Sequence, residues 1–161
     1  MASLPIKPNS AWNVAEVTAY LAATQNPLRL SVMSGKRPLI VPLWFLHDDA
    51  GLWCASKRDS FIVRKIRAQH GCGFDISDNT IPYRGVRGQG TVAIVAGDGE
   101  RVLRQLIDRY LPNPESEFAR WLLAGVDQEV AILIEPAWLS AWDFSARMRK
   151  LNAVEGDRQP G

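Results

Sequence analysis

The sequence has little cysteine, little net charge and no long apolar run. Among its 161 residues the only cysteines are Cys54 and Cys72, and they form no CxxC motif. This spacing excludes a disulfide framework and the common zinc motifs, and it suits a reducing compartment. The formal net charge of +2 provides no overall field toward nucleic acid or an anionic membrane. We therefore expect neither of them as a partner, and no metal site.

Signals for secretion and membrane insertion are also missing. The longest apolar run, Leu39 to Leu46, contains Pro42 and is too short to span a bilayer. The first ten residues hold two prolines and no apolar core of a signal peptide. We therefore expect a cytoplasmic protein. The length suits one domain, which we expect over residues 1–151, followed by a mobile polar tail over residues 152–161.

The periodicity of apolar residues predicts a mainly β chain with a few helices. Strands are predicted over residues 28–34, 39–47, 52–56, 72–77, 85–96, 129–134 and 138–144. Helices are predicted over residues 11–24 after a Ser10 cap, from an Asp59 or Ser60 cap to residue 69, from residue 98 to 110, and over 115–124. Most strands are joined by tight turns, and repeated βαβ units are missing. This favours antiparallel pairing in a small barrel that hides its edge strands.

The segment Ser56 to Ser60 could bind a phosphate. It lies between a predicted strand and a predicted helix that also bears Arg64 and Lys65. Phosphate sites gather backbone N–H groups of a helix start, hydroxyl groups and one or two cations, and this segment offers all three. The alternative is that these residues form a charged turn and the solvated face of a helix, which are common on protein surfaces.

The segment Leu39 to Phe45 is apolar on both of its predicted faces, so something must cover each face. Pro42 cannot donate a ladder hydrogen bond, which places it at a sheet edge or a bulge. A flat ring system could lie against such a strand. Packing against a helix or a second copy of the chain is the alternative.

Three glycines between Gly85 and Gly90 predict a bulge or a close backbone approach near the start of a long strand. Trp138 and Trp142 share one face of the last predicted strand, where they could serve the core, an interface or a stacked cofactor. The two histidines, His47 and His70, are isolated, and no serine or cysteine lies in the setting of a nucleophile.

In this order, the segments resemble the pyridoxamine 5′-phosphate oxidase-like family of flavin-binding split barrels. The matching stretches are residues 27–30, the strand pair over 39–56, the helix from Ser60, the block 82–90 and the segment 135–143. The resemblance implies a six-stranded antiparallel Greek-key split barrel with flanking helices. It also implies a homodimer that holds two cofactors in the clefts between its subunits.

The resemblance also implies a set of cofactor-binding residues. We assign no catalytic side chain, because a bound flavin would itself carry the hydride. Val41, Pro42, Leu43 and Trp44 would lie against the isoalloxazine ring. The phosphate would be held by Ser56, Lys57, Arg58, Ser60, Arg64 and Lys65. Arg84 and Gly85 begin the long strand beside the cofactor, and Trp142 would border the flavin from the partner subunit.

One departure from the family bears on the substrate. Phe61 and Ile62 stand where pyridoxamine phosphate oxidases have a basic pair, so Lys57, Arg58 or Arg64 would supply that charge. We find no counterpart of the arginines that bind the substrate phosphate in those enzymes, so we do not expect pyridoxamine phosphate as the substrate.

The sequence therefore predicts an FMN-dependent oxidoreductase that acts on a small molecule. One alternative is a deazaflavin-dependent reductase on the same fold. Another is a carrier or sensor that binds flavin or haem without turnover, with His47 or His70 as a candidate haem ligand.

Overall fold

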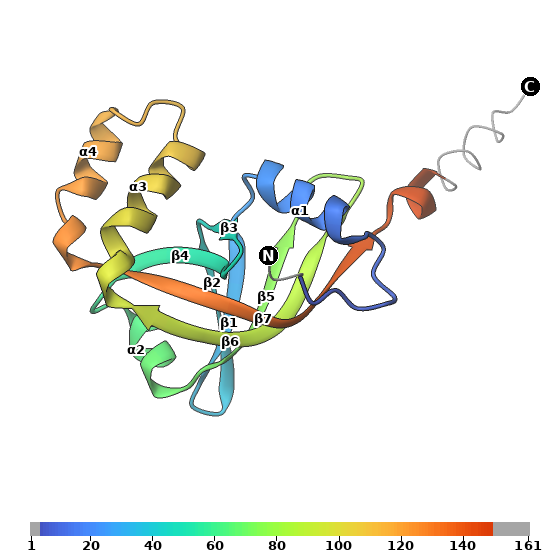
Figure 1. Ribbon diagram of the computed structural model, residues 1–161, viewed down its shortest axis with the longest axis horizontal. Helices are drawn as coiled ribbons and strands as arrows, with labels where there is room; N and C mark the ends of the chain where they lie inside the picture. The colour runs from blue at the N-terminus through green and yellow to red at the C-terminus, as the bar shows by residue number, and fades with distance from the viewer. Residues whose placement is uncertain (1–3, 150–161) are drawn as a thin grey trace, which may run out of the picture.

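The computed structural model describes residues 4–149 and shows one seven-stranded sheet with helices around it (Figure 1). The strand order is β2-β1-β5-β6-β7-β4-β3, and every pairing between these strands is antiparallel. The strands are β1 (Leu28–Ser34), β2 (Arg37–Leu43), β3 (Leu46–Asp48), β4 (Gly51–Lys57), β5 (Gly71–Ser77), β6 (Arg84–Val95) and β7 (Glu129–Asp143). The helices are α1 (Val14–Ala23), α2 (Phe61–Ala68), α3 (Gly99–Tyr110) and α4 (Glu117–Leu123). The predicted antiparallel barrel with flanking helices is confirmed, with seven strands in place of six.

The two edge strands of the sheet, β2 and β3, follow each other directly in the chain. Only Trp44 and Phe45 separate them, although they lie at opposite ends of the strand order. Such a short link requires the sheet to curl until its two edges approach, which produces a barrel. The single strand predicted over residues 39–47 is therefore wrong, because the chain breaks at the fully buried Phe45. The prediction for Pro42 is confirmed. β2 is an edge strand that pairs only with β1, so the N–H that Pro42 lacks interrupts no hydrogen bonds between interior strands.

The longest contact in the sheet joins β6 to β7, and glycines make it possible. A Cβ atom on Gly90 would lie 2.1 Å from the carbonyl oxygen of Glu135, and one on Gly88 would lie 2.4 Å from the ring of Phe74. The register shifts between Gln89 and Gly90, opposite the segment around Pro136. The predicted bulge and close approach are thus confirmed. The two strands predicted over 129–134 and 138–144 are one strand, because this bulge absorbs the proline without ending β7.

Capping side chains set the starts of the helices. α1 begins at Val14 because Asn13 and Glu16 form a capping box, with each side chain accepting a hydrogen bond from the other residue's backbone N–H. The predicted start after Ser10 is wrong, since the Ser10 hydroxyl donates to the Trp12 carbonyl oxygen and accepts from the Ala141 N–H. Ser10 therefore attaches the N-terminal segment to β7. The Ser60 cap of α2 is confirmed.

The helices close the barrel with apolar side chains. Val17 and Leu21 of α1 and Ile62, Val63 and Ile66 of α2 are buried in the main core. α3 and α4 lie side by side at one end of the sheet (Figure 1). α3 packs on the sheet through Val102 and Leu106, which meet Trp53 and Ala131, and on α4 through Leu103 and Ile107, which meet Ala119. No helix within residues 4–149 is long and apolar enough to cross a lipid bilayer.

Arg109 of α3 joins this helix to α1. Its guanidinium donates to the carbonyl oxygens of Leu21, Ala22 and Thr24 at 2.7, 3.0 and 2.6 Å. These carbonyls lie in the last turn of α1, where the helix presents unpaired acceptors and partial negative charge. The cation therefore caps α1 from a different element of the fold.

We expect Gly88→Ala to lower the free energy of unfolding by about 1–3 kcal/mol, because the added methyl group has no space beside Phe74 and the Trp138 carbonyl. Urea denaturation measures this change. Gly71→Ala is the control, since a Cβ atom there meets nothing within 4 Å. Equal stability of the two variants would show that the β6–β7 contact can relax.

Candidate functional site

The turn between β4 and α2 brings together the two serines predicted to bind a phosphate. The Ser56 hydroxyl donates to the Ser60 hydroxyl oxygen at 3.0 Å. Ser60 in turn accepts a hydrogen bond from the Val63 N–H at 3.4 Å as it caps α2. Two hydroxyl groups and the amino end of a helix therefore converge at one place, and this end of a helix favours anions.

Lys57 lies beside these serines but already has two partners. Its ammonium group is 2.8 Å from a carboxylate oxygen of Glu129 and donates to the Gly125 carbonyl oxygen at 2.8 Å. The Glu129 side chain is only 8% exposed, whereas that of Lys57 is 50% exposed. Lys57 thus neutralises a buried carboxylate, and the third N–H of its ammonium group has no partner among residues 4–149.

Arg58 ties the same turn to the segment before β7. Its backbone N–H donates to the Gln128 carbonyl oxygen at 2.8 Å, and its guanidinium donates to the Asp127 carbonyl oxygen. The side chain is exposed. Backbone carbonyl oxygens therefore hold the turn in place. The Arg58 guanidinium has no carboxylate partner in the described part of the chain.

Arg64 and Lys65 gather at the Phe61 ring in the first turn of α2. The Arg64 guanidinium donates to the Asp59 carbonyl oxygen at 2.6 Å. The cationic groups of Arg64 and Lys65 both lie over the Phe61 ring, at 5.8 and 4.8 Å from its centroid. The structure thus groups Ser56, Lys57, Arg58 and Ser60 and places these two cations at the exposed Phe61.

The strand segment predicted to lie against the flavin ring offers backbone rather than side chains. Val41 and Leu43 are half-buried and pack against the barrel core, and Pro42 is exposed on the outer face. Trp44 stacks on Tyr110 with ring centroids 5.0 Å apart and an angle of 4° between the planes. One face of the Trp44 ring is therefore already covered by the protein.

The remaining predicted residues lie at the other end of the sheet. Gly85 pairs with Trp142, and Arg84 pairs with Asp143, whereas Lys57 pairs with Glu129 near the opposite end of β7. β6 has 12 residues, so its ends are roughly 35 Å apart at the usual rise of a strand. A single copy of the chain therefore does not bring this group to the Ser56–Ser60 turn.

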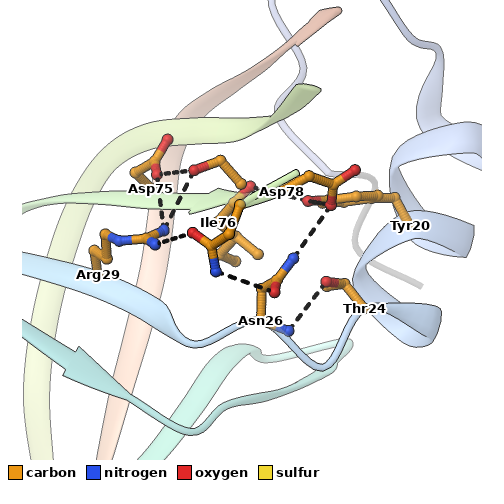
Figure 2. Close-up of polar contacts among 9 residues, drawn as sticks. Tyr20, Thr24, Asn26, Arg29, Asp75, Ile76 and Asp78 are labelled. Atoms are coloured by element: carbon orange, nitrogen blue, oxygen red, sulfur yellow. Dashed lines mark hydrogen bonds and ion pairs between the residues drawn. The ribbon is translucent and has the colours of Figure 1, made fainter. Parts of the chain in front are cut away.

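Arg84 joins a polar network around Asp78 that sequence reasoning missed. Figure 2 shows the part of this network that connects Asp78 to Tyr20 and Asn26. The Asp78 carboxylate accepts hydrogen bonds from the Tyr20 hydroxyl at 2.9 Å, from Asn26 at 3.2 Å and from Arg84 at 2.9 Å. Burial and the neighbouring carboxylate raise the pKa of Tyr20 well above its usual range. Because the partners come from three separate segments, no local pattern in the sequence could indicate the network.

A second branch of this network reaches the outer face of the sheet. Arg29 donates to Asn79 at 2.7 Å and to Ser77 at 3.3 Å, and it lies 3.5 Å from the Asp75 carboxylate (Figure 2). It borders a shallow groove of about 360 Å³ on that face. The other polar and aromatic side chains that line the groove are Ser31, Phe74, Asp75, Arg87, Gln89 and Trp138, and Ile40 lines it as well.

A larger hollow of about 740 Å³ lies between α1 and the turn from β3 to β4. Asp48, Asp49 and Glu135 line it together with His47. Burial lowers the pKa of His47, although the two aspartates oppose this effect. Neither the hollow nor the groove includes the Ser56–Ser60 turn. Between residues 4 and 149 no three His, Cys, Asp or Glu side chains lie close enough together to hold a metal ion.

No protein-family model and no curated protein matches the sequence. Solved structures match over most of the chain. The conserved hypothetical protein Rv2991 of Mycobacterium tuberculosis gives a TM-score of 0.71 at 20% identity, with 91% of each chain covered. A Listeria innocua protein assigned as a pyridoxamine 5′-phosphate oxidase gives 0.61 at 16% identity, with 81% of this chain and 97% of the other covered. An F420 reductase gives 0.59 at 23% identity, with 74% and 93% covered.

The chain has the pyridoxamine 5′-phosphate oxidase-like split-barrel fold. The fold expected from the sequence is thereby confirmed. At these sequence identities the likeness shows a shared fold and does not assign an activity.

We expect the thiols of this split barrel to react slowly. Burial raises the pKa of Cys72 to about 11 and raises that of the fully buried Cys54 further. At pH 8 the native protein should therefore react with Ellman's reagent at least roughly tenfold more slowly than free cysteine, because little thiolate is present. The rate should rise with pH and disappear in Cys72→Ser. Rapid reaction at pH 8 would show that the pKa of Cys72 is not raised.

Proposed function

We propose that this split barrel binds FMN between two copies of the chain and transfers hydride or electrons between the flavin and a small substrate. The observation that carries the proposal is the Ser56–Ser60 hydroxyl pair at the start of α2, beside the half-exposed ammonium of Lys57. Hydroxyls, a helix start and a cation with an unused donor suit a phosphate monoester. FMN, when bound, supplies the redox chemistry.

The protein's contribution would be binding and orientation. Ser60, which accepts the Ser56 hydroxyl proton, would donate its own to a phosphate oxygen, and Lys57 would supply positive charge while it remains attached to Glu129. The edge strand β2 would present the backbone of Val41 to Leu43 to the flavin ring, since its outer edge has no neighbouring strand. No side chain is assigned as an acid or base.

A second copy of the chain would complete this site. The outer face of the sheet carries Ile40, 63% exposed, and Met33, 42% exposed, next to the groove bordered by Arg29 and Arg87. Apolar side chains of this size favour an interface. Because Trp142 lies far from the turn in its own chain, it would approach the flavin of the partner subunit.

The exposed cations favour one alternative coenzyme. Arg58 adds a second cation to the turn, and Arg64 and Lys65 add two more at the neighbouring Phe61. A deazaflavin coenzyme has a longer anionic tail, and the split barrels include an F420 reductase. A carrier or sensor that holds flavin or haem without turnover is the third candidate, and steady oxidation of NAD(P)H with FMN and an acceptor would exclude it.

The phosphate site can be tested with a pair of variants. The double variant Lys57→Gln/Glu129→Gln removes the cation without leaving Glu129 buried and unpaired. We expect it to weaken FMN binding by about 1–3 kcal/mol, the size of a charge-assisted hydrogen bond. Glu129→Gln alone keeps the ammonium and should not weaken binding. Titrations with FMN, followed by flavin fluorescence, measure the affinity of both variants, and parallel titrations with a deazaflavin coenzyme compare the two cofactors. Unchanged affinity in the double variant would remove Lys57 from the site.

The interface has its own test. We expect Ile40→Glu to yield a monomer in light-scattering measurements and to lose FMN binding, because it places a charge in the centre of the proposed contact. Val14→Glu is the matched control, since Val14 is 43% exposed on α1, away from the outer face of the sheet. A monomeric wild-type protein would contradict the shared site.

A further inference from the structure

The surface of α4 carries a stacked pair of exposed aromatic side chains. The Phe118 and Trp121 rings have centroids 5.8 Å apart and an angle of 13° between their planes. They are 49% and 69% exposed. The opposite face of α4 packs on α3 through Ala119, so the pair is not needed for the core. Two large exposed aromatic rings together are typical of a surface that binds something.

This aromatic pair lies next to the proposed phosphate turn. Gly125 follows Trp121 by four residues and lies just beyond the carboxyl end of α4, whose C-cap is Ala124. A Cβ atom on Gly125 would lie 2.6 Å from the Lys57 ammonium, and its carbonyl oxygen accepts a hydrogen bond from that group. The carboxyl end of α4, less than two turns beyond Phe118 and Trp121, therefore meets the cation of the turn.

The cations at the carboxyl end of α4 have donors to spare. Lys57 uses two of its three N–H groups, and Arg58 gives one of its guanidinium nitrogens to the Asp127 carbonyl oxygen. No carboxylate within residues 4–149 pairs with Arg58. A ring surface beside such donors is complementary to a ligand that joins a flat heterocycle to phosphate groups.

We propose that Phe118 and Trp121 form a subsite for an adenine nucleotide, with the adenine stacked on Trp121 and the phosphates bound by Lys57 and Arg58. This inference rests on the proposed function, because it extends the FMN phosphate site along α4. The nucleotide could come from two sources that share this chemistry. One is the adenylyl half of FAD, and the other is the adenine half of a pyridine dinucleotide that donates electrons.

ADP is the probe for the subsite, because it carries the adenine and both phosphates without any flavin. We expect isothermal titration calorimetry to show ADP binding to the full chain, and Trp121→Leu to weaken it roughly tenfold, the effect of one base–aromatic stacking contact. Trp121→Phe keeps a ring and should retain most of the affinity. Arg58→Gln should also weaken binding, whereas Arg104→Gln, an exposed arginine on α3, should not.

Parallel titrations identify the source of the nucleotide. Tighter binding of FAD than of FMN, lost in Trp121→Leu, would assign the subsite to the coenzyme. Tighter binding of NADH than of reduced nicotinamide mononucleotide, lost in the same variant, would assign it to the electron donor.

Other outcomes would overturn the inference. These are no ADP binding by the wild type, equal ADP affinity of Trp121→Leu, or a Trp121→Leu variant that changes oligomeric state, which would make the pair a contact between proteins. FMN binding is measured separately in each variant. If FMN binds and ADP does not, the subsite fails alone, and if ADP binds and FMN does not, the flavin proposal fails.

Discussion

The close antiparallel contact between β6 and β7 is the constraint on which the rest of the structure depends. It runs almost the full length of both strands, and the missing side chains of Gly88 and Gly90 let the backbones approach. β7 also pairs with β4, so the same strand positions the Ser56–Ser60 turn at one end of the sheet and Trp142 at the other. The distance between these ends explains why a site that uses both requires two copies.

Two of the cations predicted to bind the cofactor are neutralised where they lie. Lys57 pairs with the buried Glu129, and Arg84 pairs with Asp78 inside a network that also holds Tyr20. An arriving anion therefore gains less from Lys57 than from a cation without a carboxylate partner. Hydroxyl groups and backbone donors at the start of α2 consequently carry much of the proposed phosphate recognition.

Local patterns predicted most of the strands and helices, because alternation and capping act over a few residues. β1 and the Ser60 cap of α2 appear where the sequence places them. The break at Phe45 and the merging of two strands into β7 could not be predicted, since burial in the core decides the first and pairing with β6 decides the second. For the same reason the sequence grouped Ser56 with Ser60 correctly but could not indicate the partners of Lys57 or the network of Asp78, which lie far away in the chain.

The contact of Arg109 with the end of α1 links two parts of the fold that are distant in sequence. Since one guanidinium satisfies three carbonyl groups of another helix, α1 cannot loosen at that end without releasing a cation that lies against the Phe45 ring. Arg109 therefore couples α1 to α3, and local unfolding of the carboxyl end of α1 would also remove the partners of a cation on α3.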